Sequence, residues 1–167
     1  MLFRRGSMMK VNIASNILKV LLILFAIGAI FFGIYVLPIM AEQNVLYYPE
    51  LEYAKIPIFI VCELLLVMLL IGIGIIMYLL VVFDRGNTFS LKFTKGLEIL
   101  IGMCIIASIG VILLLYYFRT FGGPGPLLSL IMIGVIFLIW IVAAVMTLIR
   151  SIVKKAMVYK DDYDLTV

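Results

Sequence analysis

Four long runs of apolar residues, separated by short polar segments, organise this chain of 167 residues. The most continuous run, residues 56–83, has Glu63 as its only charged side chain, and twenty of its residues are Val, Ile, Leu or Phe. Each such residue favours membrane insertion by roughly 0.3 to 0.6 kcal/mol at mid-bilayer, whereas one acidic residue opposes it by about 3 kcal/mol. The run is therefore predicted to be a membrane-spanning helix.

The other apolar runs predict the same structure at similar spacing. We expect four transmembrane helices within one membrane domain, joined by a polar hinge at 84–95 and followed by a tail at 150–167; the spans are about 17–37, 56–83, 97–118 and 127–149. Pro38 is expected to end the first helix, because proline lacks the N–H that a continuing helix needs. Residues 41–55 are acidic and rich in tyrosine, which is typical of a short segment on the membrane surface.

Two further segments carry turn residues. The hinge begins with Asp-Arg-Gly-Asn at 84–87, and either Thr88 or Ser90 is available to cap the helix that follows. Residues 121–126 are almost entirely Gly and Pro and are expected to form a loop outside the membrane. The fourth helix is predicted to continue beyond its span into the tail.

Composition narrows the class of protein. The chain is 66% hydrophobic and 13% charged, with a mean hydropathy of +1.33, which is far from the usage of soluble domains. Histidine is absent, which excludes Ser-His-Asp and Cys-His catalysis and imidazole ligation of metals. Both cysteines, Cys62 and Cys104, fall inside predicted spans and are interpreted as small apolar residues. We expect no enzymatic activity, no metal ion and no cofactor.

The basic residues predict the orientation. The N-terminal segment with Lys19, the hinge and the tail hold eleven of the thirteen Lys and Arg, which leaves Lys55 and Arg119 for the two other loops. The positive-inside rule then places both termini and the hinge in the cytoplasm. The expected fold class is an all-α integral membrane bundle of four helices. Because the net charge of +4 flanks the apolar runs instead of forming one patch, direct nucleic-acid binding is not expected.

Glu63 is the first candidate for a functional side chain, since an acidic residue within a span is costly and usually faces protein or water. One interpretation pairs it with Arg119, which the topology places near the same leaflet. In the other, Glu63 lies only about 10 Å along the helix from Ile56, so a tilt brings it to the interface. The sequence leaves both interpretations open.

Small residues within the spans indicate close helix packing. Gly72 and Gly74 resemble a fragment of a dinucleotide-binding fingerprint, but they lie in mid-span with no strand before them. Together with Ala29 and Gly33, four residues apart, they are better explained as helix-packing positions. Such faces could serve contacts within one bundle or between the copies of a homo-oligomer.

The hinge and the tail present charged residues at the membrane surface. Contact with lipid headgroups is one interpretation of these charges. Docking of a cytoplasmic protein partner is the other, and its candidate residues are Lys92, Lys95, Asp164, Leu165 and Thr166.

Three patterns along the chain together resemble the family called domain of unknown function 2975. They are Gly-Asn-Thr-Phe-Ser at 86–90 followed by Lys92 and Leu97, Tyr-Pro-Glu-Leu-Glu-Tyr-Ala-Lys-Ile-Pro at 48–57, and the ending Tyr-Asp-Leu-Thr-Val at 163–167. The resemblance extends from the first span to the last residue, but it departs at Tyr163, where the family has Asn, and in the Gly-Pro loop. It implies a small four-helix protein of the bacterial plasma membrane without an established activity, whose gene often lies beside that of a small helix-turn-helix regulator.

The expected function is therefore non-catalytic. We expect a regulatory or accessory membrane component that contacts lipid and binds another protein, such as a helix-turn-helix transcription regulator. The alternative is transport, either as an accessory subunit of an exporter or immunity system with a membrane partner, or as a small oligomeric channel. A channel needs a polar stripe through the bilayer, and the mid-span residues are almost all aliphatic.

Overall fold

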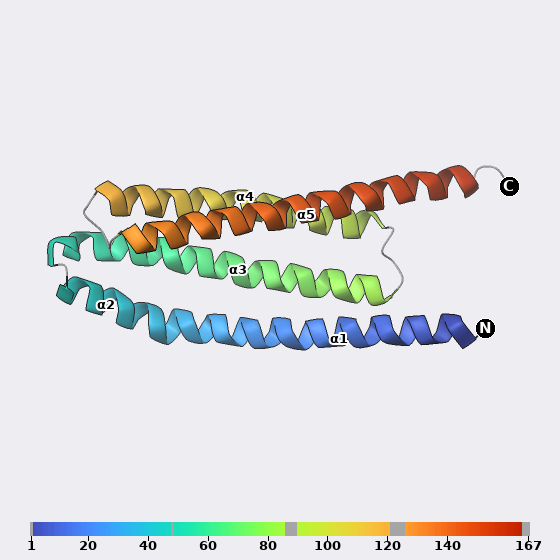
Figure 1. Ribbon diagram of the computed structural model, residues 1–167, viewed down its shortest axis with the longest axis horizontal. Coiled ribbons are helices and arrows are strands. Elements are labelled where there is room, and N and C mark those ends of the chain that lie inside the picture. The colour runs from blue at the N-terminus through green and yellow to red at the C-terminus, as the bar shows by residue number, and fades with distance from the viewer. Residues whose placement is uncertain (1, 48, 86–89, 121–125, 165–167) are drawn as a thin grey trace.

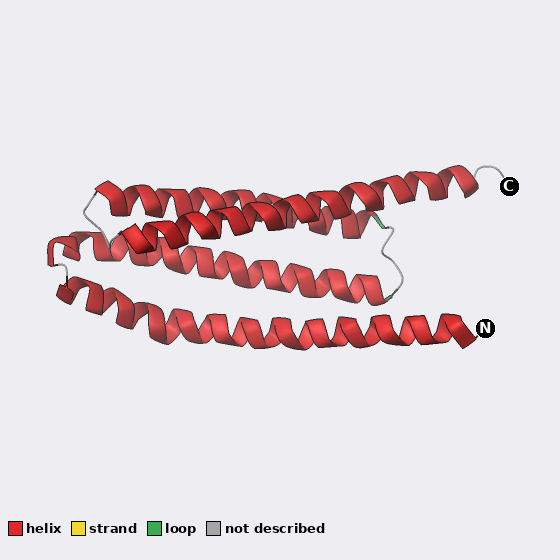
Figure 2. Cartoon of the chain, in the orientation of Figure 1, coloured by secondary structure: helices red, strands yellow, loops and turns green. Residues whose placement is uncertain are grey.

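A computed structural model describes residues 2–47, 49–85, 90–120 and 126–164. Helices make up nearly all of this described chain (Figure 2). In order they are α1 (Leu2–Phe31), the π-helical segment η1 (Phe32–Val36), α2 (Leu37–Tyr47), the 3-10 helix η2 (Pro49–Ala54), α3 (Lys55–Asp84), α4 (Leu91–Thr120) and α5 (Pro126–Asp164).

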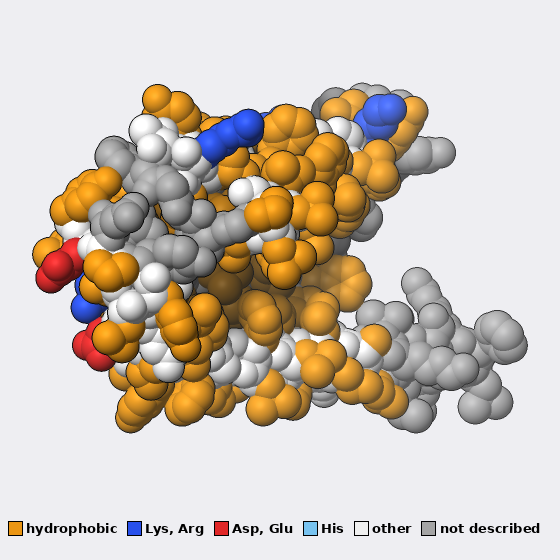
Figure 3. Space-filling model, turned by 60° about the vertical axis from the view of Figure 1, so that its left-hand side comes forward, with side chains coloured by type: hydrophobic (Ala, Val, Ile, Leu, Met, Phe, Trp, Pro, Cys, Tyr) orange, Lys and Arg blue, Asp and Glu red, His pale blue; other side chains and the backbone are white. Residues whose placement is uncertain are grey.

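Four helical stretches are long and apolar enough to cross a membrane, which confirms the predicted all-α, four-span class. They are Ile13–Tyr47, Glu52–Asp84, Leu91–Thr120 and Pro126–Tyr159. Apolar side chains cover most of the face seen in Figure 3, and the charged side chains on it are sparse. Because lipid tails are as apolar as these side chains, their exposure is compatible with contact to the bilayer.

The four spanning helices pack as an open row. Helix α1 packs on α3, α3 on α4, and α4 on α5, and no extensive contact closes the row between α5 and α1 in the described part of the chain. Figure 1 shows that the start of α1 and the end of α5 lie at the same end of the molecule as the end of α3 and the start of α4. We call this the hinge end and the opposite one the loop end.

The two outer helices of the row contact protein along one narrow face each. In α1 and η1 the less exposed positions alternate at spacings of four and three: Ser15, Lys19, Leu22, Ala26, Ala29, Gly33 and Val36. In α5 the same spacing selects Ser129, Met132, Ile136, Ile139, Ala143, Met146, Arg150, Val153 and Met157. This 3.5-residue period is the geometry of left-handed knobs-into-holes packing. The remaining faces of α1 and α5 point outward.

The best-buried apolar cluster joins three helices at the hinge end, and its members are Leu79 of α3, Phe93, Leu97 and Leu100 of α4, and Val153 of α5. Ser90 fixes the start of α4 beside it. Its hydroxyl oxygen accepts a hydrogen bond from the Phe93 N–H at 3.3 Å, which confirms the predicted cap at Ser90. The alternative cap, Thr88, lies outside the described residues. With this cap, α4 begins at Leu91, earlier than the predicted span at 97.

The prediction that Pro38 ends the first helix is wrong, because α2 carries the helix through Pro38 to Tyr47. The preceding segment η1 gives the reason. The Leu37 N–H bonds to the Phe32 carbonyl five residues back, so this turn is wider than an α-helical turn. The wider turn relieves the clash between a proline ring and the preceding carbonyl, and the helix continues with a bend (Figure 1).

Candidate functional site

Two ion pairs between helices lie at the hinge end. Asp84, the last residue of α3, accepts hydrogen bonds at the same Oδ2 atom from Ser15 Oγ, at 3.0 Å, and from Lys19 Nζ of α1. Both charged side chains are about three-quarters shielded, with 22% and 24% of their surfaces exposed. The sequence analysis counted Lys19 with the basic N-terminal segment, and the structure adds that Lys19 joins α1 to α3.

A second ion pair joins α4 to α5. Arg150 Nη2 donates to Glu98 Oε1 at 2.7 Å, and 58% of the Glu98 side chain is exposed. The Arg150 Nε atom is buried in the seam between the helices without a hydrogen-bond partner. The sequence analysis did not select Glu98. Glu98 lies near the start of α4 and Arg150 in the later part of α5, so an antiparallel arrangement of these two helices would have indicated the ion pair.

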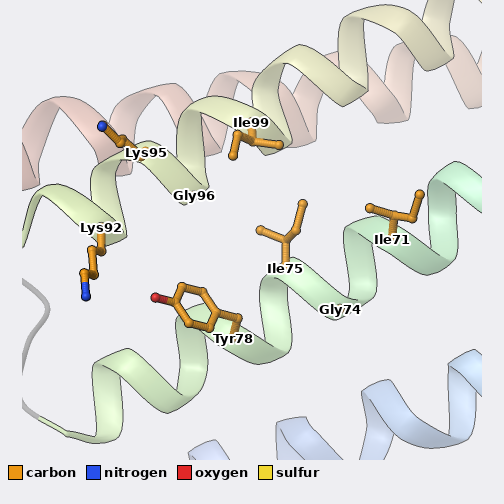
Figure 4. A pocket seen from close by; sticks show the side chains of 8 residues that line it. All are labelled: Ile71, Gly74, Ile75, Tyr78, Lys92, Lys95, Gly96 and Ile99. Atoms are coloured by element: carbon orange, nitrogen blue, oxygen red, sulfur yellow. The ribbon is translucent and has the colours of Figure 1, made fainter.

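Lys92 and Lys95 line a groove between α3 and α4. The groove has a volume of about 410 Å³ and is lined by Ile71, Gly74, Ile75, Tyr78, Lys92, Lys95, Gly96 and Ile99. Figure 4 shows the Lys92 ammonium group and the Tyr78 hydroxyl pointing towards the same end of the groove, while the isoleucines line its length. Both lysines are exposed.

Glu63 faces α1 near the loop end. Its Oε1 atom lies 3.7 Å from the position that a Cβ on Gly33 would occupy, and Leu66 Cδ1 lies 3.2 Å from the same point. Arg119 is exposed in the last turn of α4. The structure does not bring Glu63 and Arg119 together, and the ion pairs that it describes lie at the hinge end.

Two glycines that sequence reasoning missed set the contact between α3 and α4. A Cβ on Gly96 would lie 2.7 Å from Leu79 Cδ2, and a Cβ on Gly110 would lie 2.9 Å from Leu65 Cδ2. The two glycines and the two leucines are each fourteen residues apart, so they form two equivalent levels of one antiparallel contact.

The glycines chosen from the sequence lie in looser surroundings. The nearest atom to a Cβ on Gly72 is Leu100 Cδ2 at 3.9 Å, and nothing lies within 4 Å of one on Gly74. Ala29 is half-buried in the α1 seam, between the positions of Ala26 and Gly33.

Of the predicted tail residues, Asp164 is the last residue of α5, and Leu165 and Thr166 lie outside the described residues. The preceding turns of α5 are exposed on several sides. Lys154 and Lys155 are exposed, and so are Val158 and Tyr159, at 60% and 66%.

The thiols and carboxylates do not cluster. Cys62 and Cys104 are free thiols on α3 and α4, both half-buried. No group of three or more Cys, Asp or Glu side chains with metal-binding geometry occurs among the residues described.

The row of four apolar helices and the polar contacts at one end define a multi-pass membrane protein. The chain belongs to the family described as protein of unknown function (DUF2975), whose model matches residues 39–167. This confirms the family that the hinge and tail patterns indicated. The match begins within α2, so it does not include the first span, which the resemblance was expected to cover. No curated protein and no solved structure matches the chain.

Proposed function

We propose that the protein is a non-catalytic component of a bacterial plasma membrane that regulates or assists another protein by binding it at the hinge end. We assign the hinge end to the cytoplasm, since the segments at this end hold eleven of the thirteen Lys and Arg. Lys55 and Arg119 lie at the opposite end, in the first turn of α3 and the last turn of α4.

The observation that carries the proposal is the continuation of α5 beyond Arg150. Residues 151–164 extend roughly 21 Å along the axis, at about 1.5 Å per residue. The headgroup layer adds only about 5 to 8 Å to each side of the hydrocarbon core, so the end of α5 reaches past it. Val158 and Tyr159 follow Met157, whose Sδ atom lies 3.8 Å from Thr94 Oγ1 near the start of α4, so these two exposed side chains lie at the headgroup level. A soluble protein can reach them there, which supports an interaction surface for a protein.

The partner that we propose is a small helix-turn-helix regulator. The gene neighbourhood that the family resemblance implies supports this choice. Lys154 and Lys155 are exposed on the same stretch of α5, so the partner would present acidic side chains to them.

Two hydroxyl groups within the spans, those of Ser108 and Thr147, give no support to a transport pathway. Ser108 Oγ donates to the Ile105 carbonyl at 2.7 Å, and Thr147 Oγ1 donates to the Ala143 carbonyl at 2.8 Å. Each hydroxyl is satisfied by its own helix, so neither is held out towards a polar path through this part of the bilayer.

Site-specific photo-crosslinking in the native membrane tests the proposal. A photoreactive residue at Val158 is expected to capture a soluble helix-turn-helix protein, whereas one at Leu138, an exposed position of the same helix within its span, is expected to capture none. Capture of an ATPase or permease from Val158 would favour the transport role. Equal capture from both positions, or none from Val158, would contradict the proposed surface.

A further inference from the structure

The groove between α3 and α4 combines a charged end with an apolar length. Its volume is about 410 Å³, and it is open along its length, so a ligand in it stays in contact with the surrounding lipid. Its three isoleucines and two glycines offer no hydrogen-bonding side chain, so the polar groups are confined to Tyr78, Lys92 and Lys95. A ligand that fits this groove has one anionic end and one hydrocarbon end.

The two lysines carry uncompensated charge. Lys19 and Arg150 each pair with a carboxylate, but neither Lys92 nor Lys95 forms an ion pair with any residue in the described part of the chain. Among the side chains that the structure describes, no acidic one lines the groove. The Lys92 charge therefore lies at the end of the groove without a carboxylate partner among the described residues, and Tyr78 adds a hydroxyl that can donate a hydrogen bond.

The depth of the groove matches a lipid in the surrounding leaflet. Lys92 and Lys95 lie in the first turns of α4, and residues 99–118 beyond them cover about 30 Å, the thickness of the hydrocarbon core. The lysines consequently lie at the level of the phosphate groups. From Tyr78 to Ile71 the groove continues about 10 Å along α3 towards the bilayer centre, where an acyl chain lies.

We propose that this groove is a binding site for an anionic phospholipid of the leaflet at the hinge end. The Lys92 ammonium group contacts the phosphate, the Tyr78 hydroxyl donates a hydrogen bond to it, and an acyl chain lies against Gly74, Ile75 and Ile99. Lys95, whose ammonium group points to the other side of α4 (Figure 4), adds positive charge near the headgroup. The site is separate from the α5 surface proposed for a protein partner. Loss of one function therefore leaves the other measurable.

Native mass spectrometry of the purified full-length protein with phosphatidylglycerol and phosphatidylcholine tests the charged end. The intact protein is expected to retain phosphatidylglycerol preferentially. Lys92→Gln with Lys95→Gln is expected to reduce this preference roughly tenfold to thirtyfold, because each lysine near the surface contributes to anionic-lipid affinity. Lys154→Gln with Lys155→Gln removes the same charge from α5, outside the groove, and is expected to change the preference less than threefold.

A second variant tests the apolar length without altering charge. No atom lies within 4 Å of a Cβ on Gly74 or on Gly134 of α5, so a side chain at either position starts in open space. Gly74→Leu fills the groove and is expected to lower phosphatidylglycerol retention at least fivefold, whereas Gly134→Leu, on an exposed face of α5, is expected to leave it unchanged. Circular dichroism of each variant checks that helix content is kept.

Four results would overturn the proposal. They are no preference for phosphatidylglycerol in the intact protein, an equal loss in the two double-lysine variants, unchanged retention in Gly74→Leu, and displacement of the lipid by millimolar inorganic phosphate. The last result would assign the lysines to a soluble anion. Binding of a soluble protein through Lys92 and Lys95 would instead leave lipid retention unaffected by their substitution.

Discussion

Leu79 of α3 occupies the space that a side chain on Gly96 of α4 would need, since a Cβ there would lie 2.7 Å from Leu79 Cδ2. Leu79 is itself 6% exposed and belongs to the cluster at the hinge end, which limits how far it can move. The close approach of α3 and α4 therefore depends on this glycine. Lipid supplies little hydrophobic drive for helix association, so such packing contacts hold the row together.

We predict that Gly96→Ala destabilises the protein by about 1–3 kcal/mol, the usual cost of overpacking a filled contact. Gly134→Ala gains the same helix propensity in open surroundings and serves as the control. Leu79→Ala alone should also destabilise, but the double variant should lose less than the sum, because the new methyl group enters the vacated space. Reversible unfolding in mixed micelles measures the free energy of unfolding of the two single variants and the double variant. If the loss in the double variant equals the sum of the two single losses, the contact is contradicted.

The contact of Lys19 and Ser15 with Asp84 predicts a charge-dependent link between α1 and α3. Asp84→Asn and Lys19→Gln should each lower the thermal midpoint of the purified protein, and the exchange of Lys19→Asp with Asp84→Lys should recover part of the loss. High salt should reduce the difference, because the pair is partly exposed. A charge exchange that is less stable than either single variant would show that the pair does not join these helices.

Glu63 lies against Gly33, and no ion pair to it is found among the described residues. Glu63→Gln should therefore change the free energy of unfolding by less than about 0.5 kcal/mol, as is usual for substitutions that break no partnered contact. Gly33→Leu should destabilise, since Leu66 already lies 3.2 Å from its Cβ position. A loss of stability in Glu63→Gln that Arg119→Gln reproduces would revive the pairing inferred from the sequence.

The π-helical turn before Pro38 predicts the effect of removing the proline. In Pro38→Ala the backbone N–H is restored and η1 can tighten into an α-helical turn, which rotates the residues after it by about 100° about the axis. Spin-label distances between positions 30 and 43 on the two sides of η1 should change accordingly. Unchanged distances would mean that other contacts hold the turn open.

The apolar runs predicted the number and order of the spans because lipid insertion depends on local composition, and each run carries that signal by itself. Ser90 was predicted as a cap for the same reason, since capping depends on a few neighbouring residues. The path through Pro38 was missed because it depends on a π-helical turn formed by Phe32–Val36, which have no distinctive composition.

The site was harder to predict because its geometry arises between helices. Gly96 and Gly110 look no different from Gly72 and Gly74 in the sequence, and only the register of α3 against α4 selects the first two as close contacts. The partners of Lys19 and Arg150 likewise depend on which helices are neighbours. The open row brings α1 to α3 and α5 to α4, and hydropathy carries no information about that order.

The central claim is that four helices cross the membrane with both termini and the hinge in the cytoplasm. Single cysteines at Asn44 and Lys155, in a protein whose Cys62 and Cys104 are replaced by Ala, test it through labelling of intact cells with a membrane-impermeant maleimide. The account predicts labelling at position 44 from outside, and labelling at position 155 only after the membrane is opened. Labelling of position 155 in intact cells, with position 44 protected, would contradict it.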